Sequence, residues 1–117
     1  MTSFQWILLA ATAALLVFML RRRFGDVSAA EARTLVEGGA LLLDVRTPAE
    51  FAGGHLPGAV SVPLAELEGR LAELGPKDRA VVIYCASGVR SAVADGVLAG
   101  AGFDPVKNLG AMANWNR

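Results

Sequence analysis

The stretch that decides the fold of this chain is Ala80–Ser91, AVVIYCASGVRS. Its first residues, Ala80–Tyr84, form an apolar run of the kind found in strands that are buried on both faces of a sheet. Cys85 follows directly, then a loop of short side chains that ends at Arg90, and a helical pattern begins near Ser91. Because ligands bind at the carboxyl ends of strands in α/β sheets, this arrangement predicts a functional site around Cys85.

Strands and helices alternate along the rest of the chain. Apolar runs predict strands at residues 40–45, 59–62 and 103–109, and apolar spacing predicts helices at 28–37, 48–52, 64–74 and 91–101. Ser28 and Thr47 are each followed by a glutamate three residues later, which is the capping-box signature of a helix start. This alternation predicts an α/β domain with a mostly parallel central sheet flanked by helices.

Composition narrows the range of functions. A chain of 117 residues has room for one compact domain, and its single cysteine cannot form a disulfide within the chain, which suits a reducing compartment. From Phe24 onward there are eight Lys or Arg and eleven Asp or Glu, a net charge of −3 without a basic stripe, so we predict no nucleic-acid partner. His55 is the only histidine, which excludes a metal site built from histidines.

Residues 1–23 differ in character from the rest. Phe4–Leu20 carries no charge and would form a helix of about 25 Å, which reaches across a membrane core of about 30 Å once residues 1–3 are added. Arg21–Arg23 follows, and the positive-inside rule then places the rest of the chain in the cytoplasm. We therefore predict a single transmembrane helix at residues 1–23 that anchors a domain at residues 24–117 to the inner (cytoplasmic) membrane, facing the cytoplasm.

Two other interpretations of this segment stay open at this point. A cleaved secretory signal would carry positive charge before the apolar run and a small-residue site after it, whereas here the basic cluster follows the run. A buried core helix would show a polar face, and residues 4–20 show none. Both interpretations fit the sequence less well than an anchor.

The loop after Cys85 has the composition of an anion-binding turn. Gly88 tolerates positive φ values, so the chain can curl tightly there, and the loop N–H groups at a helix start would favour negative charge. Arg90 adds a positive charge that does not titrate. We therefore predict that Cys85 is a nucleophile held as a thiolate. The residues expected to bind an anionic substrate around it are Ala86, Ser87, Gly88, Val89 and Arg90.

Three separated segments resemble the rhodanese-like sulfurtransferase domain. They are LLLDVRTPAEFAGGHLPGAVSVP (Leu41–Pro63), VIYCASGVRS (Val82–Ser91) and NLGAMANW (Asn108–Trp115), and the resemblance extends over Val27–Trp115. Together they are more specific than any one segment, because all three occur in the family's order. The resemblance implies a rhodanese-like fold in which Cys85 carries the sulfur.

The resemblance also implies the reaction. A Cys85 thiolate would take the sulfane sulfur of thiosulfate or a similar small donor, hold it as a persulfide, and pass it to a thiol or cyanide acceptor. This chemistry needs no metal or organic cofactor. Asp44 and Arg46 match the family's Asp-Val-Arg segment, and we expect them to make structural polar contacts near the rim of the site. Glu50 is expected only to cap its helix, and His55 to stabilise a turn.

Two other functions stay open from the sequence. A rhodanese-like binding or regulatory module would need neither Cys85 nor the complete loop. Small phosphatases and arsenate reductases with a similar loop place one more residue between cysteine and arginine than the four that separate Cys85 from Arg90 here. A loop that is one residue shorter encloses a smaller space, which suits one sulfur atom better than a phosphoryl group.

Overall fold

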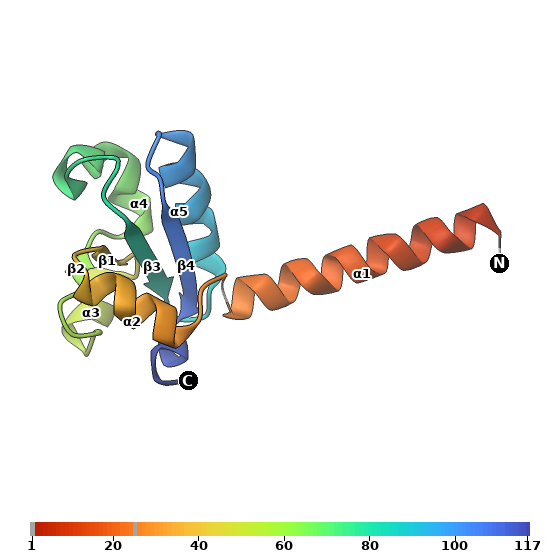
Figure 1. Cartoon of the computed structure of the whole chain (residues 1–117), viewed down its shortest axis with the longest axis horizontal. Helices are drawn as coiled ribbons and strands as arrows, with labels where there is room; N and C mark the ends of the chain where they lie inside the picture. The colour runs from red at the N-terminus through yellow and green to blue at the C-terminus, as the bar shows by residue number, and fades with distance from the viewer. Residues whose placement is uncertain (1, 25) are drawn as a thin grey trace.

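The computed structural model describes the backbone of residues 2–24 and 26–117 and the side chains of residues 2–17 and 26–117. It shows an α/β domain from which the N-terminal helix projects (Figure 1). In chain order the elements are α1 (Ser3–Phe24), α2 (Ala29–Glu37), β1 (Leu41–Asp44), α3 (Pro48–Ala52), β2 (Val60–Ser61), α4 (Leu64–Leu67), η1 (Glu68–Leu74), β3 (Val81–Cys85), α5 (Val89–Gly100), β4 (Val106–Ala111) and η2 (Met112–Asn116), where η marks a 3₁₀ helix.

In the described residues the central sheet has four parallel strands in the order β2-β1-β3-β4. β1 and β3 lie in the middle, and every residue of both strands is buried. Parallel strands that are covered on both faces are expected to be apolar along their whole length, as these nearly are. The predicted α/β class, with a parallel sheet flanked by helices, is therefore confirmed.

Apolar cores lie on both faces of this sheet, because successive strand residues point to opposite sides. Leu43 and Ile83 belong to the core that includes Leu98 of α5. Val82 and Tyr84 belong to the other core, which α2 covers. The same alternation places the side chain of Cys85, the last residue of β3, on the face of the sheet that α5 covers.

α3 begins as the sequence predicts. Thr47 Oγ1 accepts a hydrogen bond from the Glu50 N–H at 3.2 Å, and the Glu50 carboxylate accepts one from the Thr47 N–H at 3.2 Å. Pro48 occupies the first helical position, where its missing N–H costs no helical hydrogen bond. This capping box holds the Glu50 side chain at the start of α3.

The helix predicted at residues 64–74 is interrupted. Only Leu64–Leu67 is α-helical, and the chain continues as 3₁₀ turns in which Arg70 leaves helical geometry, with φ −122° and ψ 16°. Gly69 directly precedes this kink, and glycine is a poor helix former because it loses more backbone freedom than other residues. The leucine spacing therefore predicted the buried face correctly, but the prediction of one continuous helix was wrong.

The starts of two elements also differ from the prediction by two residues or more. α5 begins at Val89 rather than Ser91, because the loop already ends at the left-handed residue Gly88. β4 begins at Val106 rather than Phe103. Pro105 precedes it, and proline has no N–H to donate to a neighbouring strand.

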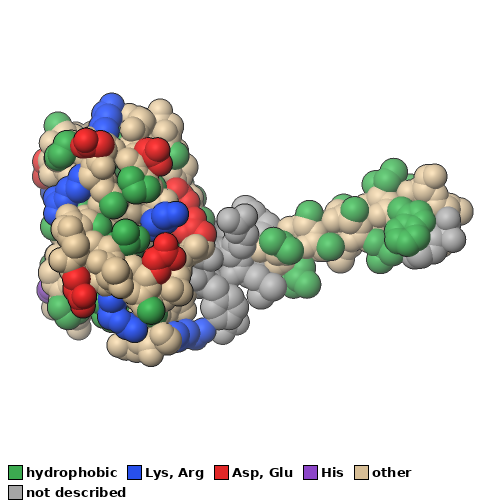
Figure 2. Space-filling view, viewed as in Figure 1, with side chains coloured by type: hydrophobic (Ala, Val, Ile, Leu, Met, Phe, Trp, Pro, Cys, Tyr) green, Lys and Arg blue, Asp and Glu red, His purple; other side chains and the backbone are tan. Residues whose placement is uncertain are grey.

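α1 lies outside both cores. The described side chains of residues 2–17 are exposed, with Phe4 at 68% and Trp6 at 61%, and Figure 2 shows hydrophobic side chains along the projecting helix. This excludes the core-helix interpretation. The backbone of α1 continues as a helix to Phe24. Among the residues that the structure describes in full, 2–17 and 26–117, no helix is both long and apolar enough to cross a membrane, so the predicted transmembrane helix is not supported.

Candidate active site

The candidate site lies at the carboxyl ends of the two central strands. Cys85 is the last residue of β3, and Asp44 is the last residue of β1. β1 and β3 pair so that Asp44 stands opposite Tyr84, one residue before the cysteine. The sheet therefore brings the Asp-Val-Arg segment next to the Cys85 loop, although the two segments are far apart in the sequence.

The loop after Cys85 wraps around its sulfur. Gly88 adopts a left-handed conformation with φ +99°, and its backbone N–H donates a hydrogen bond to Cys85 Sγ at 2.9 Å. A residue with a Cβ would be strained at this φ, so glycine is favoured here. The Cys85 thiol donates to Ser91 Oγ at 3.5 Å, and that hydroxyl donates to the Gly88 carbonyl at 3.2 Å. The sulfur is thus held by the loop and by the first turns of α5.

Cys85 is fully buried in this structure. Ala86, Ser87 and Val89, which were predicted to bind substrate, are exposed around it, whereas Gly88 is buried. A molecule that approaches Cys85 from this side would therefore meet these loop residues before it reaches the sulfur.

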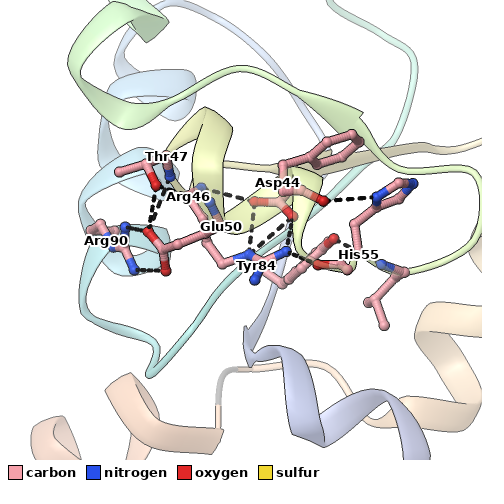
Figure 3. Close-up of polar contacts among 10 residues, drawn as sticks. Asp44, Arg46, Thr47, Glu50, His55, Tyr84 and Arg90 are labelled. Carbon is pink, nitrogen blue, oxygen red and sulfur yellow. Dashed lines mark hydrogen bonds and ion pairs between the residues drawn. The ribbon is translucent and has the colours of Figure 1, made fainter.

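Arg90 makes a contact that the sequence analysis did not anticipate. Its Nη1 and Nη2 donate to Glu50 Oε1 and Oε2 at 2.6 and 3.0 Å, a two-pronged ion pair between α5 and α3 (Figure 3). Both side chains are about one-third exposed, at 33% and 34%. Glu50 Oε1 also accepts from Thr47 Oγ1 at 3.0 Å. The predicted anion-binding arginine is therefore already paired with a carboxylate.

This ion pair shifts the protonation equilibria of both partners. The Arg90 hydrogen bonds lower the pKa of Glu50 to about 2, helped by the Thr47 N–H. The same hydrogen bonds to Glu50, with a smaller electrostatic contribution from Asp44, in turn raise the pKa of Arg90 above its usual value. Both groups therefore stay charged at any pH near neutrality, and their charges offset each other.

Asp44 and Arg46 form a second ion pair, which lies in the interior of the domain. Arg46 Nη2 lies 2.8 Å from Asp44 Oδ2, and its Nε donates to both carboxylate oxygens at 3.1 Å. Asp44 is fully buried and Arg46 is 6% exposed. Arg46 also donates to the Gly54 carbonyl at 2.7 Å, which ties β1 to the turn after α3. The predicted structural polar contacts are present, but they lie in the interior rather than at the rim.

Tyr84 completes this buried network. Its hydroxyl accepts a hydrogen bond from the Leu56 N–H at 3.1 Å, and its ring lies under the Arg46 guanidinium at 5.7 Å. Burial, with a smaller contribution from the neighbouring Asp44 carboxylate, raises the pKa of Tyr84 well above its usual value. Tyr84 therefore stays neutral and links β3 to the turn at residues 54–58.

His55 has a local role in that turn. Its exposed ring stacks on Phe51 with a centroid distance of 3.8 Å, and Nδ1 lies 3.1 Å from the Phe51 carbonyl oxygen. Among the described residues, no cluster of three or more His, Cys, Asp or Glu side chains is arranged to hold a metal ion.

The sequence analysis missed the site roles of Glu50, Tyr84 and Ser91. One sequence feature pointed to Glu50, because it lies in the segment Leu41–Pro63 that matches the family. Its position in a capping box, however, already explained a glutamate there. Tyr84 gave no separate signal, because it ends the apolar run Ala80–Tyr84. The contact between Ser91 and Cys85 requires the curl of the loop, which spacing alone does not specify.

Comparison with known proteins identifies the family of this chain. The family model described as the rhodanese-like domain matches residues 28–117. A protein named sulfurtransferase from Allochromatium vinosum is 47% identical over 78 residues, which is 66% of this chain and 72% of that protein. Thiosulfate sulfurtransferase PspE from Escherichia coli is 35% identical over 71 residues, 60% of this chain and 68% of that protein.

Solved structures show the same similarity. The human single-domain sulfurtransferase TSTD1 superimposes with a TM-score of 0.71 at 31% identity, over 78% of this chain and 94% of that one. A structure described as rhodanese with anions from E. coli superimposes with a TM-score of 0.62 at 31% identity, over 65% of this chain and 91% of that one. Together with the cysteine loop at the carboxyl end of the central strand β3, these matches show that the chain belongs to the rhodanese-like domain family and is a sulfurtransferase.

Proposed function

We propose that this enzyme moves a sulfane sulfur from thiosulfate or a similar donor to a thiol or cyanide acceptor, with Cys85 carrying the sulfur as a persulfide. The observation that carries the proposal is the hydrogen bond from the Gly88 N–H to Cys85 Sγ at 2.9 Å. A backbone donor aimed at the sulfur stabilises a thiolate, which is the nucleophilic form of cysteine. The thiosulfate sulfurtransferase relative supports thiosulfate as a donor.

The first half-reaction forms the persulfide. The Cys85 thiolate attacks the outer sulfur of thiosulfate and forms a new S–S bond. The original S–S bond breaks with its electron pair on the departing sulfite. No oxidant or reductant is required, because the sulfur transferred is already at the sulfane level.

The second half-reaction returns the free enzyme. An acceptor thiolate or cyanide attacks the terminal sulfur of the persulfide, and the electron pair of the broken bond returns to Cys85. Between the two half-reactions, the N–H groups of the loop stabilise the negative charge on the terminal sulfur. Such a scheme predicts ping-pong kinetics with two substrates.

Intact mass spectrometry tests this proposal on the full chain. Incubation with thiosulfate is expected to add one sulfur, about 32 Da, and an added thiol is expected to remove it. Cys85→Ser is the control and should show no gain, because it removes the only thiol in the chain. Absence of any adduct with thiosulfate, thiosulfonates and persulfides would instead favour a binding or regulatory module. Turnover of an aryl phosphate or arsenate without sulfur loading would favour the phosphatase or reductase alternative.

The cellular location stays a prediction from the sequence. The charge-free run before Arg21–Arg23 predicts the inner (cytoplasmic) membrane, with the catalytic domain in the cytoplasm. Alkaline extraction of membranes from cells that make the full chain tests it. Release of the protein into the soluble fraction would contradict the prediction.

A further inference from the structure

Glu50 places a negative charge beside the arginine of the Cys85 loop. The Arg90 guanidinium is the cation that the loop would present to an anion, and both of its terminal nitrogens are bound to the Glu50 carboxylate at 2.6 and 3.0 Å. Arg46, the other guanidinium labelled in Figure 3, is bound to Asp44 through its Nε and Nη2. In the described part of the chain, each of these two guanidinium groups is therefore matched by a carboxylate.

We propose that Glu50, through its ion pair with Arg90, sets the charge selectivity of the site in favour of singly charged sulfur donors over doubly charged ones. This inference rests on the proposed sulfur transfer through Cys85. Glu50 acts as a positioning and specificity residue, because it acts on the donor through Arg90 and through its own charge.

The physical argument is the repulsion between the donor and an extra carboxylate. A doubly charged donor near Glu50 experiences twice the unfavourable Coulomb energy that a singly charged donor experiences at the same place. The Thr47 N–H and Oγ1 hold Glu50 at the start of α3, so the carboxylate cannot swing away without losing its cap. With both charges about one-third exposed, the effect is reduced by solvent and by salt but not removed.

A matched pair of donors isolates this effect. Thiosulfate carries two negative charges, and methanethiosulfonate carries one. Each transfers its outer sulfur to the Cys85 thiolate, with sulfite or methanesulfinate leaving with the bonding electrons. A purely structural role for Glu50 would change the loading rates of both donors by the same factor, whereas charge selectivity changes their ratio.

The informative variant is Glu50→Gln. Glutamine also serves as the third residue of a capping box, so α3 should keep its start. The matched control is Glu73→Gln, which removes the same charge from a two-pronged pair with Arg70, at 2.8 and 2.9 Å, on η1. A second variant, Glu50→Asp, keeps the charge but shortens the side chain. It should therefore retain the wild-type ratio of the two donors.

The experiment measures the second-order rate constant for sulfur loading of the full chain, by intact mass, with each donor. Glu50→Gln is expected to raise the rate constant about threefold for methanethiosulfonate and about tenfold for thiosulfate, since the second factor is the square of the first. Both factors should shrink at high ionic strength, and Glu73→Gln should leave the ratio unchanged. Thermal melts of the variants confirm that they are folded.

Each other outcome has a clear meaning. Equal changes for both donors, or a change with Glu50→Asp as large as with Glu50→Gln, would overturn the inference and leave Glu50 a structural role. A selective loss with thiosulfate would also overturn it, and would show instead that Glu50 orients Arg90 to bind dianions. If the wild-type chain loads sulfur from neither donor, the proposed function itself fails, which is a separate result.

Discussion

The backbone N–H of Gly88 points at Cys85 Sγ from 2.9 Å, and Gly88 reaches that position with a φ of +99°. The catalytic proposal depends on this relationship, because a single backbone conformation both directs the donor hydrogen at the sulfur and begins α5.

Gly88→Ala tests whether this conformation is required. An alanine at this φ is expected to destabilise the domain by about 1 kcal/mol or more, or else to flatten the loop and withdraw the N–H from the sulfur. In either case sulfur loading from thiosulfate should fall, and urea unfolding measures the stability change.

The matched control for that prediction is Gly96→Ala. Gly96 lies inside α5, where an added Cβ would meet open space. Alanine is the better helix former there, so this variant should gain up to about 1 kcal/mol of stability and load sulfur normally. Equal losses in the two variants would contradict a special role for Gly88.

Asp44→Asn tests the buried ion pair. The substitution leaves the 6% exposed Arg46 guanidinium without its counter-ion, and breaking a buried pair in this way costs about 3–5 kcal/mol. Urea unfolding at neutral pH gives the free energy of unfolding. The much more exposed pair of Arg70 and Glu73 provides the comparison, and Glu73→Gln should have a far smaller effect. A similar loss in both variants would show that Asp44 and Arg46 are not effectively buried.

The pH dependence of stability should reveal the ion pair of Glu50. Arg90 lowers the pKa of Glu50 from 4.5 to about 2, so the folded state favours the ionised form. The resulting stabilisation is present above the usual pKa of 4.5 and is lost as the pH falls toward about 2. The difference in melting temperature between wild type and Glu50→Gln should therefore be largest near neutrality and shrink below pH 4.5. A difference that does not change with pH would contradict the ion pair.

Two truncations test how the domain depends on the N-terminal helix. Deletion of residues 2–23 should leave the free energy of unfolding and sulfur loading unchanged, because the apolar cores of the described residues include no side chain of α1. Deletion through Val27 should cost at least about 2 kcal/mol. It removes a 6% exposed core residue and the hydrogen bonds between Asp26 and Asn108, at 2.7 and 2.8 Å. Unfolding on the shorter deletion would show that α1 supports the core.

The sequence by itself determined the strands, helices and helix caps that form through interactions between nearby residues. The apolar run before Cys85, the caps at Ser28 and Thr47, and the alternation of strands with helices were sufficient for the α/β class and the parallel sheet. These features depend on hydrogen bonds and side-chain spacing within a few residues, which the order of residues specifies directly. The break at Arg70 was the local exception, because the leucine spacing of a buried face fits an α-helix and a 3₁₀ turn about equally well.

Only the tertiary structure decided the electrostatics of the site. Glu50 and Arg90 are forty residues apart in sequence, and they meet because β1 and β3 pair side by side and bring the start of α3 next to the Cys85 loop. The same pairing buries Asp44 with Arg46 instead of leaving them at a rim. Charges act through space, so the partner of each charged side chain depends on which strands are neighbours, and no local pattern in the sequence contains that information.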